Sequence, residues 1–165
     1  MLLLALASVA CGYRVGGQGA RLPGEIKVIA IPAFENQTPW MRLEQRLTAA
    51  VMQEFIHRTR YRVVGQAEGA DAVLQGTVKA ARSTPVIFDP VTGRASTVQV
   101  TVILGAELRD RRNKKTLYAD ANYRFREQYE ITGDLDSFFE ERDPALDRLA
   151  RDFAASLVSA ILENF

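Results

Sequence analysis

Residues 97–131 read TVQVTVILGAELRDRRNKKTLYADANYRFREQYEI, and this stretch decides the fold. In its first part, apolar side chains occupy every second position: Val98, Val100, Val102, Leu104, Ala106 and Leu108. In its second part, the same alternation runs through Leu117, Ala119, Ala121, Tyr123, Phe125, Tyr129 and Ile131. A period of two residues is typical of a strand with one buried face. The sequence therefore predicts two half-buried antiparallel strands, joined by a charged and solvated turn over 109–115.

Two further strands are expected before this hairpin. Residues 72–81 precede a connection over 83–94, in which Asp89-Pro90 and Thr92-Gly93 are turn signals. Residues 26–31, IKVIAI, are apolar on both faces, and Pro32 follows them directly. An apolar run of this kind indicates a strand that is covered on each side.

A helix is predicted between this first strand and a second short one. Thr38 and Pro39 stand in the order of an N-cap and a first-turn proline, and the helix is expected to run to about Thr59. An apolar stripe recurs every four residues, at Leu43, Leu47, Val51 and Phe55. Residues 61–64 then form a strand. A strand, helix and strand in this order form a crossover unit with parallel neighbours.

A long terminal helix completes the predicted fold. Ser137 and Glu140 form a capping-box pattern, and Asp143 and Pro144 stand as cap and first helical residue. The buried stripe of this helix is expected at Leu146, Leu149, Phe153, Leu157 and Ile161. The sequence thus predicts an α+β fold with a mixed four- to five-stranded sheet and two main helices packed on one face. The expected order is β-α-β-β-β-β-α.

The N-terminus has the pattern of a lipoprotein leader. A short apolar run, residues 2–10, ends at Cys11, with Ala10 as the small residue before it and Gly12 after it. The run is too short to span a bilayer, which takes about 20 apolar residues as a helix. We therefore predict that residues 1–10 are a cleaved signal peptide, that residues 11–165 form a single domain and that Cys11 carries a covalent lipid. A buried free cysteine is the alternative.

Composition excludes several classes of function. With 21 basic and 20 acidic residues, the chain has no charge excess that would favour nucleic acid. A single cysteine permits neither an internal disulfide nor a thiolate zinc site. The one histidine, His57, has no nucleophile motif near it and is given no role. The acidic residues at 134–143 lack the EF-hand spacing, and helix-start charge explains them better. We predict neither an enzyme nor a metal or cofactor site.

Ordered blocks along almost the whole chain resemble one family. These blocks are CGYRVGG after the leader, LPGEIKVIAIPAFENQT, LEQRLTAAVMQEFIHRTRYRVV, ADAVLQGTV, TGRAS, LYADANYRFREQYEI and the segment from FFEERDPAL to ILENF. Together they resemble the LptE family of lipopolysaccharide-assembly lipoproteins. The resemblance implies a non-enzymatic lipoprotein of the outer membrane, on its periplasmic face. It also implies that the protein plugs the LptD barrel and helps to deliver lipopolysaccharide to the cell surface.

Lipopolysaccharide carries phosphates and carboxylates, which proteins bind through arginine and lysine. Solvation explains each basic residue taken singly, but a binding role is expected for at least one of a set of seven. This set is Arg94, Arg111, Arg112, Lys114, Lys115, Arg124 and Arg126.

A second resemblance leaves an alternative function open. KVIAIPAFENQT also resembles the opening of periplasmic lipoproteins of the CsgG and LpoB type. Those proteins form a secretion pore or activate a cell-wall synthase. Their resemblance covers only the first strand, the loop and the helix.

Overall fold

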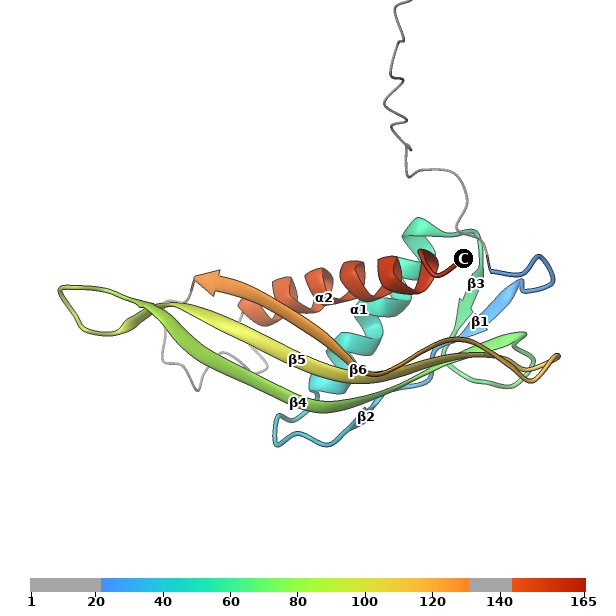
Figure 1. The fold of residues 1–165 in the computed structure, drawn as a ribbon, viewed down its shortest axis with the longest axis horizontal. Coiled ribbons are helices and arrows are strands. Elements are labelled where there is room, and N and C mark those ends of the chain that lie inside the picture. The colour runs from blue at the N-terminus through green and yellow to red at the C-terminus, as the bar shows by residue number, and fades with distance from the viewer. Residues whose placement is uncertain (1–21, 131–143) are drawn as a thin grey trace, which may run out of the picture.

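The computed structural model describes residues 22–130 and 144–165. Eight elements follow one another along the chain, as labelled in Figure 1. They are β1 (Val28–Ala30), β2 (Glu35–Asn36), α1 (Leu43–Arg58), β3 (Arg62–Val64), β4 (Ala72–Phe88), β5 (Ala95–Asp110), β6 (Lys115–Glu130) and α2 (Pro144–Leu162). The predicted order is confirmed, with the two-residue strand β2 added between β1 and α1.

One mixed sheet carries all six strands, in the order β3-β1-β4-β5-β6, with β2 paired to β4. β1 lies parallel to β3 and β4, as the crossover through α1 predicts, whereas β4, β5 and β6 are antiparallel neighbours. Both helices lie on the same side of the sheet (Figure 1). The α+β class, the mixed sheet and the two helices on one face are therefore confirmed.

The core lies between this sheet face and the two helices. All six apolar positions predicted for β5 are buried, as are the α1 stripe and the α2 stripe. β1 is covered on both sides, as its sequence predicts. Ile29 and Ile31 belong to the main core, and Ala30 packs with Ala70 and Val73 in a second, smaller cluster.

α1 begins later than predicted. Asn36 organises a turn ahead of the helix, because its Oδ1 accepts hydrogen bonds from the backbone N–H and the hydroxyl of Thr38. The Nδ2 group of Asn36 also donates to the carbonyl of Trp40 and to Glu44. Thr38 is thus part of an Asx turn. The helix starts only at Leu43, after Arg42 in the left-handed region at φ 63°.

β4 is longer than the sequence suggests. The segment expected as a connection continues as strand to Phe88, so the loop shrinks to the residues between Phe88 and Ala95. The turn signals at 89–93 mark only the end of the segment, and the strand before them includes Pro85, although proline cannot donate to a sheet ladder. Here Pro85 pairs with Val98 on one side, and no described strand pairs with it on the other. An edge of this kind tolerates proline.

Two bulges break the predicted alternation of β6. Leu104 pairs with Tyr123 and Ala106 with Asp120, so two residues of β6 lie opposite Gly105 alone. A second register shift falls between the pairs of Leu108 and Arg109. Each bulge moves the following side chains to the other face. Between the bulges, Asp120 therefore takes the helix-covered side that the sequence assigned to Ala119.

Candidate binding surfaces

The seven predicted basic residues lie in three separate places. Arg111, Arg112, Lys114 and Lys115 belong to the β5–β6 turn and its end, and Arg94 belongs to the β4–β5 turn. These two turns lie at opposite ends of the long strands (Figure 1). Arg124 and Arg126 lie on β6, between the two ends. Cys11 lies outside the described residues. The order of the predicted strands already places the two turns at opposite ends, whereas the neighbours of Arg124 and Arg126 on other strands depend on register.

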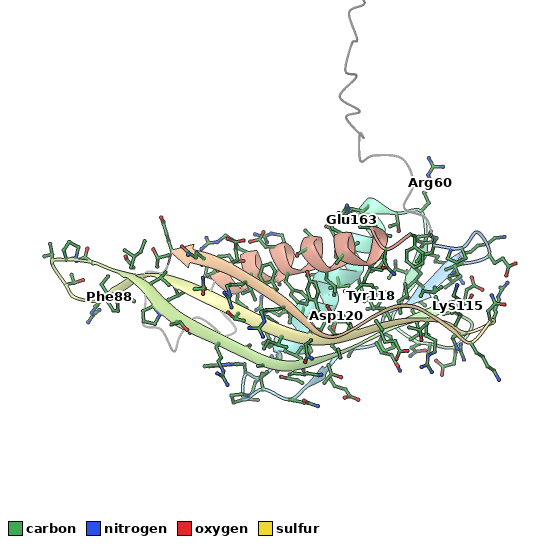
Figure 2. All side chains as sticks on the ribbon, viewed as in Figure 1. Arg60, Phe88, Lys115, Tyr118, Asp120 and Glu163 are labelled. Atoms are coloured by element: carbon green, nitrogen blue, oxygen red, sulfur yellow. The ribbon has the colours of Figure 1, made fainter. Side chains whose placement is uncertain are left out.

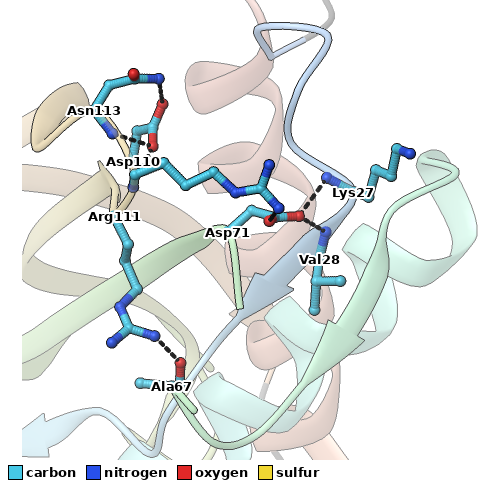
Figure 3. Close-up of polar contacts among 8 residues, drawn as sticks. Lys27, Val28, Ala67, Asp71, Asp110, Arg111 and Asn113 are labelled. Carbon is cyan, nitrogen blue, oxygen red and sulfur yellow. Dashed lines mark hydrogen bonds and ion pairs between the residues drawn. The ribbon is translucent and has the colours of Figure 1, made fainter. Parts of the chain in front are cut away.

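Asp71 anchors the β5–β6 turn to the start of the sheet. Its Oδ2 accepts hydrogen bonds from the backbone N–H groups of Lys27, at 2.9 Å, and Val28, at 3.0 Å (Figure 3). Its Oδ1 forms an ion pair with Arg112. The two backbone donors, and then the nearby guanidinium, lower the pKa of Asp71 from its ordinary value. Arg112 therefore has a structural partner within the chain.

The turn itself is built around Asp110. This carboxylate accepts hydrogen bonds from the backbone N–H of Arg112, at 2.8 Å, and from the backbone and side-chain N–H groups of Asn113 (Figure 3). Arg111 donates to the carbonyl of Ala67 in the β3–β4 loop. The turn is exposed, as expected, and its two arginines also hold it against neighbouring segments. Lys114 and Lys115 are exposed and form no ion pair with a described residue.

The β4–β5 turn is tightly ordered around Asp89. The Oδ1 of Asp89 accepts hydrogen bonds from the backbone N–H groups of Val91, at 2.9 Å, and Thr92, at 2.7 Å, and from the Thr92 hydroxyl. The backbone N–H of Asp89 donates to the Arg94 carbonyl at 2.8 Å, and Gly93 takes φ 67° as its turn requires. These bonds fix the backbone that carries Arg94.

Large apolar side chains are exposed at this turn. We call them the apolar tip: Val86, Ile87, Phe88 and Val91, which are 41, 54, 56 and 91% exposed. Figure 2 shows Phe88 far from the helices, at the end of the β4–β5 hairpin. Exposed apolar clusters typically mark a binding surface. The tip was not predicted, although the run VIF and Val91 stand in the segment expected as a connection over 83–94.

The sheet face away from the helices carries a group of cations. Residues paired directly across antiparallel strands share a face. Arg82, Thr101 and Arg126 therefore lie in one row across β4, β5 and β6, and Arg124 lies in the next row, opposite Ile103. We call this side of β4, β5 and β6 the open face. We call its four central cations the basic band: Lys79, Arg82, Arg124 and Arg126.

A shallow groove separates the two helices on their outer side. Its volume is about 480 Å³, and its lining includes the alanines Ala49, Ala50, Ala150 and Ala154. Arg46 pairs with Asp147 at its rim, and His57 is also in the lining. Within residues 22–130 and 144–165, no three His, Cys, Asp or Glu side chains are grouped as metal ligands would be. Neither described helix has the length and apolar character to cross a membrane.

Solved structures share this fold at low sequence identity. A single-substitution variant of PelC from Paraburkholderia phytofirmans, described as a dodecamer, has a TM-score of 0.52 and 17% identity, over 83% of this chain and 87% of that one. A hypothetical protein from Chlamydia trachomatis has a TM-score of 0.53 and 13% identity, over 82% and 98%. A protein from Xanthomonas campestris has a TM-score of 0.50 and 13% identity, over 87% and 90%. These similarities concern the fold alone.

Sequence comparison goes further than the fold. No curated protein is significantly similar to this chain in sequence. A family model for LptE, described as lipopolysaccharide-assembly, matches residues 26–161, which include every strand and almost all of α2. The chain therefore belongs to the LptE lipopolysaccharide-assembly family.

Proposed function

We propose that this protein is an outer-membrane lipoprotein that plugs an LptD-like β-barrel and assists the insertion of lipopolysaccharide at the cell surface. It acts without catalysis, and Cys11 carries the lipid that holds it on the periplasmic face. The family match over residues 26–161 supports this proposal. The match also favours it over the CsgG- and LpoB-like alternative, because that resemblance ends with the first helix.

The observation that carries the proposal is the apolar tip beside Arg94. Ile87 and Phe88 are more than half exposed, and the ordered turn pairs the backbone of Arg94 with that of Asp89, the residue after Phe88. Lipopolysaccharide joins acyl chains to phosphates, so a ligand of this kind needs apolar contact and a cation together. A fixed turn supports binding, because little backbone freedom remains to be lost.

Binding of purified lipopolysaccharide to the protein tests this proposal. Burying an Ile or Phe side chain fully contributes about 1.5–3 kcal/mol, so Ile87→Ser with Phe88→Ser should weaken binding at least about tenfold. The matched control replaces two apolar side chains that are exposed elsewhere, Met41→Ser with Ile56→Ser. Equal binding by both double variants would contradict a role for the apolar tip.

Partner and anchor have separate tests. Affinity purification from detergent-extracted membranes should recover an LptD-like barrel in about equal amount with the protein. Cys11→Ser should leave a folded domain that washes off membranes, because stable attachment needs about two lipid signals and the core needs none. Mass spectrometry of the native N-terminus should find a lipid on Cys11, and an unmodified thiol there would contradict this part of the proposal.

A further inference from the structure

The open face is a large polar surface that no described helix covers. Its side chains alternate with the buried positions of β4, β5 and β6, and both helices lie on the other side (Figure 1). The residues around the basic band are mostly neutral and polar, namely Thr77, Thr84, Gln99, Thr101, Ile103 and Gln128. A surface of this composition can accept and donate hydrogen bonds across a flat contact.

Charge is unevenly distributed over this face. Glu107 is neutralised there, because Arg109 lies 2.9 Å from its Oε1. Glu130 lies at the far end, opposite Thr97. The rows between these two carboxylates hold the four cations of the basic band and one acidic residue at their margin, Glu35 of β2, which accepts a hydrogen bond from the Thr77 hydroxyl. Neither Arg82, Arg124 nor Arg126 forms an ion pair with a described residue.

A hydrogen bond to the backbone fixes the position of Lys79, one member of the basic band. The side chain of Lys79 crosses over Gly105, and its Nζ donates to the carbonyl of Ala121 in the β6 bulge at 2.6 Å. A Cβ on residue 105 would lie only 3.2 Å from the Cε of Lys79. Gly105 therefore leaves room for the lysine, and the bulge supplies its acceptor. Lys79 is held over the centre of the open face beside Arg124.

We propose that the basic band docks on a carboxylate-bearing strip of the inner wall of the β-barrel partner, a step that rests on the proposed function. A barrel wall is a sheet, so its inward side chains repeat about every 6.8 Å along a strand, as Arg124 and Arg126 do here. Packed sheets lie about 10 Å apart, a gap that arginine and carboxylate side chains together can span. The strand spacing and the positive charge of the basic band support this choice of partner.

A glycolipid is the less suitable occupant of the open face. Its acyl chains need apolar contact, which the surface around the basic band offers only at Ile103 and small residues, whereas Ile87 and the rest of the apolar tip lie at the end of the hairpin. Small ligands are usually held in concave sites, and the groove described above lies on the helix side.

Affinity for the purified barrel partner, measured in detergent, tests the inference with a pair of matched variants. Arg124→Glu with Arg126→Glu reverses two charges of the basic band. The control, Arg60→Glu with Arg62→Glu, reverses two exposed charges with the same spacing at β3 (Figure 2 labels Arg60). We expect at least about tenfold weaker binding for the first pair and a change within about twofold for the second.

Photocrosslinking supplies a second measurement that does not depend on charge. A photoreactive amino acid at Thr101, in the centre of the open face, should crosslink to the barrel, whereas one at Gln53 on α1 should not. Equal affinity of the two charge variants, or crosslinking from Gln53 alone, would overturn the inference. If Arg124→Glu with Arg126→Glu lost lipopolysaccharide binding but bound the barrel unchanged, that result would also overturn the inference. Failure of the unmodified protein to bind the barrel would instead refute the proposed function.

Discussion

Truncation of Phe153 is the sharpest test of how α2 is packed. Its side chain is fully buried in the middle of the helix. The ring makes edge contacts with Phe125, with centroids 5.8 Å apart and planes at 83°, and with Tyr123, at 6.1 Å and 77°. Phe153 thus joins the terminal helix to the edge strand β6, and Phe153→Ala would remove both ring contacts at once.

The expected cost follows from this geometry. Phe→Ala at a buried position costs about 3–5 kcal/mol, because transfer energy is lost and a cavity remains. Each edge-to-face pair contributes about 0.5–1.5 kcal/mol within that total. A domain is typically stable by only about 5–15 kcal/mol. For a chain of this size, the melting temperature should fall by about 6–20 °C.

Urea and thermal unfolding of the protein without its lipid anchor would measure this cost. Phe153→Leu keeps most of the volume but loses both ring contacts, so it should cost about 1–3 kcal/mol, less than Phe153→Ala. Ile56→Ala, on the exposed side of α1, should change the unfolding midpoint little. A midpoint that is unchanged in Phe153→Ala would refute the packing argued here, and would mean that α2 presents this stripe to a partner.

Three further substitutions test contacts that hold the sheet ends. Gly76→Ala should lower the free energy of unfolding by about 1–3 kcal/mol, because the new Cβ would lie 2.7 Å from the buried ring of Phe34. An unchanged midpoint of urea unfolding would show that the ring moves freely. Asp71 has a lowered pKa in the folded protein, so its stabilisation is present at neutral pH and is lost as pH falls through that lowered pKa. Asp71→Asn should therefore flatten the acid limb of a plot of stability against pH, and parallel limbs would disprove the assignment. Arg112→Glu places a second anion beside the Asp71 carboxylate and should lower the melting temperature clearly more than Lys114→Glu, whereas equal effects would show that the ion pair does not form in solution.

Sequence patterns correctly predicted the elements in which buried residues recur at a constant spacing. β5 alternates without interruption, and each apolar residue that this pattern selected is buried. The stripes of α1 and α2 were found in the same way. Prediction failed where a side chain competes with the pattern. Asn36 forms a turn that delays α1, and the turn signals at 89–93 hid the extension of β4 through Pro85 to Phe88.

The candidate sites were harder to predict, because they depend on pairing between distant segments. Arg124 and Arg126 could be selected by their spacing on one strand, but Lys79 and Arg82 join them only through the β4–β5–β6 register. A single-strand pattern could not place the bulge opposite Gly105 either. Conversely, Arg111 and Arg112 were selected as turn charges, and their partners Ala67 and Asp71 lie about forty residues earlier in the chain.

The basic band and the apolar tip differ from the buried core, because neither of them stabilises the folded chain. Structures with 13–17% identity have the same fold, so many sequences can specify this core. Folding explains a buried Phe153, but it does not explain Phe88 in water or Arg124 beside Arg126, because exposed apolar groups and neighbouring like charges do not stabilise the folded chain. Both arrangements become favourable only when a second molecule supplies apolar contact or opposite charge. We therefore infer that function in this chain depends on the open face and the hairpin end, and that substitutions there should alter binding while leaving the unfolding midpoint in place.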